Sequence, residues 1–360
     1  MTRYPLALAL AALFTLPASA DEPFRQDFDT IRVADGVTAY IAHPSPGGLV
    51  QGNIVLISGE RHSLLVDAGQ YPRLARRIVE AIGASGAPPV KYLVNTHWHG
   101  DHLLANHVFE QAWPGLTVIQ HAETARLGAL NYAEWAEKNV PEMATMPERL
   151  EQALVTGVNL QGGPLTDRQR EIYPLNAALI RQWLPDGLET RWSPPDLTIT
   201  GDLTLDLGGR TVAVRHLGPA NTTGDIVVWD EASRTLATGD IVVAPTPYSF
   251  GSYHSEWIEA LAAMRALAPA KIVPGHGPVM DDDTYLRQLA ELLEATRREV
   301  RAAVATGKSL EQIKQEITLP AYERLFAGDD EVLVRAFRSF YLAPGIEQAW
   351  KEAVGEKRSD

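Results

Sequence analysis

The heptapeptide THWHGDH, residues 96–102, carries three histidines and one aspartate. The whole chain of 360 residues has only 10 histidines, so this segment concentrates them strongly. Burying several imidazoles beside a carboxylate costs free energy unless something coordinates them, and a divalent metal ion does so. We therefore predict that His97, His99, Asp101 and His102 bind metal. The carboxylate also makes the cluster suitable for two metals.

The elements around the motif explain why these side chains should meet. Residues 90–95, VKYLVN, are apolar enough to predict a strand that ends just before the motif. His97 and His99 are two positions apart, so an extended chain points both to the same side. Asp101 and His102 follow at the start of a predicted helix. The four side chains should therefore converge on one small volume.

Strand and helix patterns alternate on both sides of the motif. Residues 53–70 predict two apolar strands joined by a polar turn, and residues 71–84 predict a helix with apolar side chains at four-residue spacing. Residues 117–121 predict another strand. This alternation favours a layered α/β fold in which helices cover the faces of a sheet.

The rest of the chain divides into three further stretches. Residues 122–194 mix tryptophans, prolines and charges at helical spacing, which predicts a helical insertion. Residues 197–238 predict two hairpins, followed by a helix over 255–267 and a strand at KIVPG. Residues 282–360 predict a charged, helical C-terminal extension that forms a solvated outer layer.

The N-terminal 20 residues predict an export signal. Arg3 provides a positive start, residues 6–16 form an apolar run too short to span a bilayer, and residues 18–20 (ASA) resemble a cleavage site. We expect residues 1–20 to be removed, leaving a periplasmic or secreted protein without stable membrane insertion. A retained membrane anchor is the alternative. The main domain would then cover residues 21–281, including the insertion.

Charge and cysteine content narrow the classes of partner and metal site. The chain has 45 acidic and 32 basic residues, a net charge of −13. Such a chain repels nucleic acid and anionic membrane surfaces, which favours a small-molecule partner. There is no cysteine, so a metal must be held by His, Asp, Glu or Asn. The sequence does not indicate an oligomeric state.

The motif and its surroundings resemble the metallo-β-lactamase fold superfamily. The stretch NTHWHGDHLLAN is similar to the family's strand-to-helix junction, and three further motifs that resemble family motifs occur in the expected order. These are Asp67 in LLVDAG, Asp240 in ATGD and His276 in VPGHGP. The resemblance covers about residues 35–280 apart from the insertion. It implies a four-layer αββα sandwich in which Asp67 supports the site from behind, Asp240 bridges two metals and His276 is the last ligand.

One motif differs from the family pattern at a ligand position. The stretch GPANTTGD, residues 218–225, has Asn221 where the family usually has a histidine that completes the first metal site with His97 and His99. An amide oxygen is a weaker zinc ligand than imidazole. Asn221 could still ligate, directly or through water, or His216 could replace it. In the third interpretation the first site is weak or empty, and one metal remains on Asp101, His102, Asp240 and His276.

The resemblance also implies the chemistry. We expect one or two zinc ions per chain and hydrolysis by a metal-bound hydroxide, which Asp101 would orient while passing its proton to the leaving group. Di-iron relatives carry a glutamate at the position of His99, so this histidine favours zinc. Iron and manganese remain alternatives because Asp240 supplies a hard bridging oxygen.

The substrate is less defined, because this fold acts on lactams, lactones, thioesters, sulfate esters and phosphodiesters. The absence of cysteine excludes the β-lactamases with a cysteine ligand, and Asp240 is more similar to the thioesterase and lactonase branches. We predict an exported metal-dependent hydrolase of a lactone, thioester, lactam or sulfate ester. The alternative is a protein of the same fold that binds metal and a ligand or partner without turnover.

Several aromatic residues after Asp240 are candidates for substrate contacts. Tyr248, Tyr253 and His254 lie in PTPYSFGSYHSEW, and loops that follow strand ends commonly carry such contacts. The same residues could equally serve packing. His121, at the end of a predicted strand, could support the ligands from behind or pack in the core.

Overall fold

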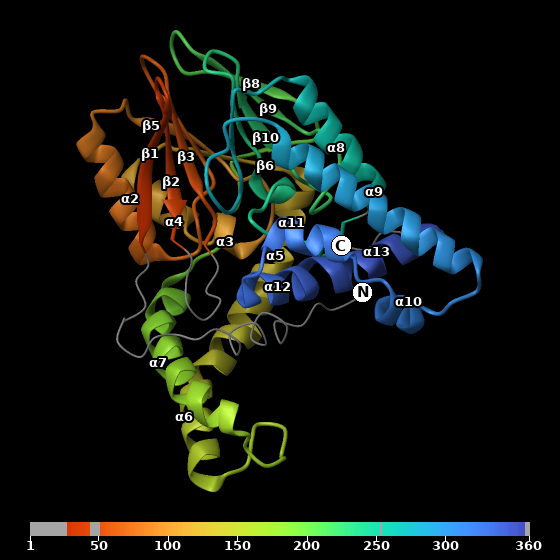
Figure 1. Cartoon of the computed structure of the whole chain (residues 1–360). Coiled ribbons are helices and arrows are strands. Elements are labelled where there is room, and N and C mark those ends of the chain that lie inside the picture. Colours follow the sequence, from red (N-terminus) through yellow and green to blue (C-terminus); the bar gives the residue numbers. More distant parts are fainter. Residues whose placement is uncertain (1–26, 44–50, 253, 357–360) are drawn as a thin grey trace.

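A computed structural model describes residues 27–43, 51–252 and 254–356 (Figure 1). The predicted export signal and Tyr253 lie outside the described residues. Within this part of the chain, two β-sheets pack face to face and helices cover both outer faces (Figure 1). The αββα sandwich predicted from the sequence is therefore confirmed.

The first sheet follows the order of the chain. Its first four strands are antiparallel neighbours. The later strands run parallel, because a helical crossover separates each from the next. The strands are β1 (Phe28–Ala34), β2 (Val37–Ala42), β3 (Ile54–Ser58), β4 (Ser63–Val66), β5 (Val90–Val94), β6 (Thr117–His121) and β7 (Leu197–Ile199).

The second sheet has the order β12-β11-β10-β9-β8 in the described part of the chain. Two antiparallel hairpins build most of it, as predicted, and β12 adds to β11 in parallel. The strands are β8 (Leu203–Asp206), β9 (Thr211–Arg215), β10 (Val227–Asp230), β11 (Thr235–Ala237) and β12 (Lys271–Val273).

Apolar side chains from both sheets fill the space between them. Val55 lies opposite Val66 in the first sheet, and Val228 lies opposite Val214 in the second. All four are buried in one cluster that contains residues of both sheets. Since the side-chain period of a strand is two, these registers fix which residues face the interior.

Helices pack on the outer face of the first sheet. In α2 (Pro72–Ser85) the predicted apolar stripe is buried through Leu74, Ile78 and Ile82. The helix starts at a proline, whose missing N–H costs nothing at that position. Two short helices after β5, α3 (Gly100–Leu103) and α4 (Asn106–Ala112), complete this part of the layer.

The predicted insertion is helical and forms the crossover between β6 and β7. Two of its helices form an antiparallel hairpin that extends away from the sandwich (Figure 1). Arg73 of α2 pairs with Asp186 of this hairpin, which attaches it to the body. The elements are α5 (Ala122–Glu134), the π-helix η1 (Trp135–Asn139), α6 (Val140–Thr156) and α7 (Asp167–Glu189).

The C-terminal residues are helical as predicted, but they are not merely a solvated layer. Leu286 and Leu293 of the first of these helices are buried against the second sheet, and Phe337 and Ile346 join the same cluster. The charge count of the segment reflects only its outer faces. The helices on this side are α8 (His254–Ala266), α9 (Thr284–Ala305), α10 (Leu310–Glu316), α11 (Pro320–Ala327), α12 (Glu331–Ala336), the π-helix η3 (Phe337–Leu342) and α13 (Ala343–Ala353).

None of the helices in the described ranges has the length and apolar character needed to cross a membrane.

Candidate metal centre

The predicted ligands come together at the ends of strands from both sheets. The THWHGDH segment leads from β5 into α3, and the 3-10 turn η2 (Gly239–Ile241) follows β11. His276 follows β12. Only packing of the two sheets brings these three segments to one edge. The residues gathered there are His97, His99, Asp101, His102, Asp240 and His276.

Four ligand atoms form a compact group, which we call the tetrahedral set: Asp101 Oδ2, His102 Nε2, Asp240 Oδ1 and His276 Nε2. His102 Nε2 lies 3.4 Å from Asp101, 3.1 Å from Asp240 and 3.3 Å from His276 Nε2. His276 Nε2 lies 3.0 Å from Asp101 and 3.4 Å from Asp240. Metal–ligand bonds of roughly 2.0–2.1 Å in a tetrahedron require ligand separations of about 3.3 Å. Five of the six separations within the set therefore have the spacing that a zinc-sized ion requires.

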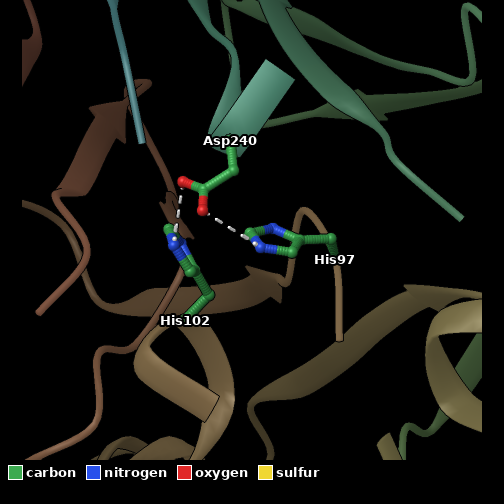
Figure 2. Close-up of side chains that lie close together, drawn as sticks. All are labelled: His97, His102 and Asp240. Atoms are coloured by element: carbon green, nitrogen blue, oxygen red, sulfur yellow. Dashed lines mark ion pairs between the residues drawn. The ribbon is translucent and has the colours of Figure 1, made fainter. Parts of the chain in front are cut away.

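The other oxygen of Asp240 faces the histidine pair His97 and His99. Asp240 Oδ2 lies 3.5 Å from His97 Nε2 and 3.9 Å from His99 Nδ1. Figure 2 shows this carboxylate between His97 and His102, one oxygen toward each. Asp240 is thus placed to bridge two ligand groups. The Asn221 amide Nδ2 lies 3.5 Å from His99 Nδ1, so this side chain borders the pair.

Asp67 lies behind the ligands and holds two segments together. Its carboxylate accepts hydrogen bonds from the backbone N–H of Thr96 at 2.7 Å and from the Thr96 hydroxyl at 2.9 Å. The same carboxylate is 2.8 Å from His102 Nδ1. Asp67 itself has a φ of 63°, in the left-handed region that aspartate tolerates better than most residues.

These hydrogen bonds fix the orientation and tautomer of His97. Because the Thr96 hydroxyl donates to Asp67, it must accept from His97 Nδ1, which is 3.0 Å away. Nε2 of His97 therefore carries a lone pair toward Asp240. This atom is buried and makes no hydrogen bond within the described residues. A buried lone pair facing a carboxylate is unfavourable unless a cation lies between them, so the residues fit a metal.

Comparison with known proteins agrees with this geometry. The sequence profile of the metallo-β-lactamase superfamily matches residues 47–276. The chain belongs to this superfamily. The match ends at His276, so the C-terminal helices lie outside it.

Two relatives are similar over much of the chain. One is the "Beta-lactamase-like protein 2 homolog" of Caenorhabditis elegans, 21% identical over 81% of this chain and 78% of that protein. The other is the "Linear primary-alkylsulfatase" of Pseudomonas sp. (strain ATCC 19151), 24% identical over 67% of this chain. This chain matches only 44% of the alkylsulfatase's length.

Solved structures share the fold at low identity. A metallo-β-lactamase from Pontibacter korlensis has a TM-score of 0.53 and 19% identity over 74% of this chain and 99% of its own. The metallo-β-lactamase FIM-1 from Pseudomonas aeruginosa, in its mono-zinc form, has a TM-score of 0.51 and 17% identity over 76% of this chain and 97% of its own. At such identities the likeness shows the fold alone.

Charge and burial set the protonation of the candidate metal ligands. Although burial opposes it, the carboxylates of Asp240 and Asp101 raise the pKa of His102 well above its usual value. Burial is likewise outweighed at His276, where Asp240 and Asp101 raise the pKa to about 9. The two histidines in turn hold the pKa of Asp101 and of Asp240 well below the usual value. At His97, burial lowers the pKa, which keeps this ring neutral.

The Asn221 position is built by the turn that follows it. Asp225 accepts hydrogen bonds from the backbone N–H of Ala220 and Thr222 and from the Thr222 hydroxyl. The Asn221 side chain is buried as a result. From the sequence we expected a family histidine at this position, and the structure places Asn221 beside His99.

His216 does not replace that histidine in the structure. Its Nδ1 lies 2.8 Å from the backbone carbonyl oxygen of Asp225, to which it donates, and its ring stacks on His121 at 4.4 Å. Neither of the His/Asp groups that could hold a metal in the described residues contains it. His121 accepts a hydrogen bond from the Glu123 backbone, so it caps α5. Neither hydrogen bond connects this stacked pair to a ligand.

Glycines make room for two of the ligands. A Cβ at Gly275 would overlap with Asp240 Oδ1 and lie 2.7 Å from the Gly239 backbone carbon. A Cβ at Gly52 would lie 2.6 Å from His102 Cε1. The Gly275 N–H donates to the Gly239 carbonyl oxygen and the Gly52 N–H to the Asp101 carbonyl oxygen, which holds both backbone segments this close to the ligands.

The residues predicted to contact substrate differ in their burial and position. Tyr248 is partly exposed, and its ring lies 6.3 Å from that of His276. His254 is fully buried, stacks on Tyr341 and has Nε2 at 3.2 Å from the Ser249 hydroxyl. Burial lowers its pKa to about 4. The prediction of a substrate contact at His254 is therefore corrected: its side chain supports the loop from within the core. Tyr253 is outside the described residues.

Sequence reasoning missed three residues near the ligands. Thr96 and Trp98 lie within the motif itself; Thr96 connects Asp67 to His97, and the Trp98 ring lies 4.5 Å from that of His99. Their position in the motif was a signal that could have found them. Phe340 packs on Tyr248, but nothing in its local sequence pattern indicates this contact.

Proposed function

We propose that this protein is an exported, metal-dependent hydrolase of a small molecule. The tetrahedral set is the observation that carries the proposal. Five of its six ligand separations, 3.0–3.4 Å, suit a metal ion, and the nearby Nε2 of His97 has no hydrogen-bond partner among the described residues. Membership of the metallo-β-lactamase superfamily supports hydrolysis as the reaction class.

Zinc is the metal we propose, with iron or manganese as alternatives. Three imidazoles of the site, His97, His102 and His276, suit zinc, and no thiolate is available in the chain. The two ligand groups are unequal. The tetrahedral set would hold a metal more tightly, whereas binding at the pair His97 and His99 would depend on Asp240 and on the weaker Asn221 amide.

The chain's own residues supply binding, orientation and proton transfer. When bound, the metal lowers the pKa of water and polarises the bond under attack. Asp101 is ionised, since His102 and His276 lower its pKa, so it accepts a proton and does not donate one at the outset. A carboxylate at this position can orient a water molecule and then pass its proton to the leaving group.

The bond cleaved is that of a lactone, thioester, lactam or sulfate ester. The similarity to a linear primary-alkylsulfatase puts sulfate esters first in this series, although only part of that protein is matched. The acidic charge of the chain disfavours phosphodiesters in nucleic acids.

The place of action is proposed from the N-terminal sequence alone. The positive start, short apolar run and ASA site of residues 1–20 favour export to the periplasm or beyond the cell. Fractionation of expressing cells, with mass spectrometry of the N-terminus, tests this. A mature chain that begins at Asp21 in the exported fraction is expected, and an intact Met1 in the cytoplasm would contradict it.

The test of function combines metal content with turnover. Protein purified without chelator would be analysed by plasma mass spectrometry and screened on one substrate of each bond class, before and after metal removal. We expect hydrolysis in one class that is lost on metal removal and in Asp101→Asn. Asp206→Asn, an exposed carboxylate paired with Arg61, is the matched control and should keep full activity.

Asn221 supports one rival function. Metal uptake without turnover on any class would favour the non-catalytic alternative, a metal-binding protein of the same fold that holds a ligand or partner. Failure to bind any metal, even on titration, would overturn both proposals.

A further inference from the structure

Three aromatic side chains form a continuous surface, which we call the aromatic wall: Tyr248, Phe250 and Phe340. The Tyr248 and Phe340 rings are 5.2 Å apart and the Phe250 and Phe340 rings 5.9 Å, in T-shaped contact. Tyr248 and Phe250 are 6.1 Å apart, so each ring touches both others. All three side chains remain partly exposed to solvent.

The aromatic wall adjoins the metal centre. The Tyr248 ring lies 6.3 Å from the His276 ring, and His276 belongs to the tetrahedral set. A molecule whose reacting bond lies at the metal centre would therefore extend along these rings.

The wall is built as a fixed structure. The backbone N–H of Ser249 donates to the carbonyl oxygen of Phe340 at 2.8 Å, which ties the loop after Asp240 to the C-terminal helices. Behind it, the Ser249 hydroxyl meets His254, and His254 stacks on Tyr341. Phe340 itself lies in the π-helix η3, and single π-turns within helices are frequent at functional sites.

The wall combines the family core with a segment outside it. Tyr248 and Phe250 lie within residues 47–276, whereas Phe340 comes from the C-terminal helices beyond that match. A residue supplied from outside the shared core can give this member a preference of its own. Large partly exposed rings that converge beside a reactive centre are the usual lining of a ligand site.

We propose that the aromatic wall binds an apolar alkyl or aryl group of the substrate, and that Phe340 determines this specificity. The inference rests on the proposed function, because it needs a reacting group held at the metal centre. It goes further by stating that the substrate carries an apolar part next to the bond that is cleaved.

Alkyl hydroxamic acids provide a direct test, since the hydroxamate chelates a metal and the tail can reach the wall. Metal-loaded protein would be titrated calorimetrically with acetohydroxamic, butanohydroxamic, hexanohydroxamic and benzohydroxamic acid. Affinity should rise with tail length, by up to about fourfold per methylene, because burial of one CH₂ contributes about 0.8 kcal/mol. Affinity for benzohydroxamic acid should likewise exceed that for acetohydroxamic acid.

Variants test whether the rise in affinity with tail length comes from the aromatic wall. Phe340→Ala and, from the other segment, Phe250→Ala should flatten the rise with tail length while leaving acetohydroxamic acid binding unchanged. Phe340→Leu keeps most of the apolar volume and should retain part of the rise. Leu325→Ala removes an exposed apolar side chain of the same C-terminal helices and should behave as wild type. Thermal unfolding would show that each variant is folded.

The outcomes separate the two proposals. Affinity that does not depend on the tail in the wild type, or a rise unaffected by both wall variants, would overturn the aromatic wall as the apolar site and leave the hydrolase proposal standing. No binding of any hydroxamate together with no metal uptake would overturn the metal centre, and the wall proposal with it.

Discussion

Asp67 Oδ2 lies 2.8 Å from Nδ1 of His102, and both side chains are buried. The carboxylate thereby directs Nε2 of the same ring toward Asp101 and Asp240. A ligand histidine held in this way keeps one ring nitrogen aimed at the metal position, and the loss of such partners usually weakens metal binding.

The variant Asp67→Asn tests this support. The amide keeps the shape and tolerates the φ of 63°, and its oxygen can still accept from the Thr96 backbone. Its NH₂ group would then face His102 Nδ1 and force the ring proton onto Nε2. We expect metal affinity to fall by about 10- to 100-fold, measured by competition with a chromogenic chelator. Unchanged affinity would show that Asp67 does not position the ligand.

The variant Asn221→His tests whether the pair His97 and His99 binds metal more weakly than the tetrahedral set. An imidazole beside His99 should tighten the weaker group, so metal content should approach two ions per chain at lower free metal. Asn221→Ala removes the amide and should weaken the same group. Calorimetric titration distinguishes the two binding steps. A second step that is equally tight in all three proteins would show that Asn221 is not a ligand.

Metal affinity should rise with pH. In the metal-free protein the raised pKa values, about 9 for His276 and well above the usual value for His102, mean that both rings carry a proton at neutral pH. Metal binding must displace these protons. Between pH 6 and 8 the affinity should therefore increase by about tenfold per pH unit or more, and calorimetry in buffers of different ionisation enthalpy should record proton release. A flat profile would contradict protonated ligands.

The variant Gly275→Ala tests the close approach of backbone and ligand. The added Cβ would displace Asp240, whose two oxygens face both ligand groups, so binding of both metals should weaken. The strain should also lower the free energy of unfolding by about 1–3 kcal/mol.

The matched control for this variant is Gly83→Ala in α2. Nothing lies within 4 Å of the Cβ there, and replacing a glycine in a helix should stabilise the protein by about 0.5–1 kcal/mol without changing metal affinity. Equal metal affinity in Gly275→Ala and Gly83→Ala, measured by chelator competition, would contradict the steric argument.

The local sequence pattern was enough to predict most of the helices and strands. The stripe Leu74, Ile78 and Ile82 predicts α2, and the apolar run 90–95 predicts β5, because burial on one face leaves a period in the sequence. The same reasoning misjudged residues 282–360, where charged outer faces concealed buried positions such as Leu286 and Phe337. Composition averages over both faces of a helix, whereas packing uses only one.

By itself, the sequence determined which residues could bind metal, and the order of their motifs indicated the protein family. His97, His99, Asp101 and His102 are close in the chain, so a strand end followed by a helix was enough to bring them together. Only the tertiary structure decided that one oxygen of Asp240 faces His97 and the other His102, that His254 is buried, and that Phe340 meets Tyr248. These relationships join segments far apart in the chain, and they depend on how sheets and helices pack, which leaves no period or spacing in the local sequence.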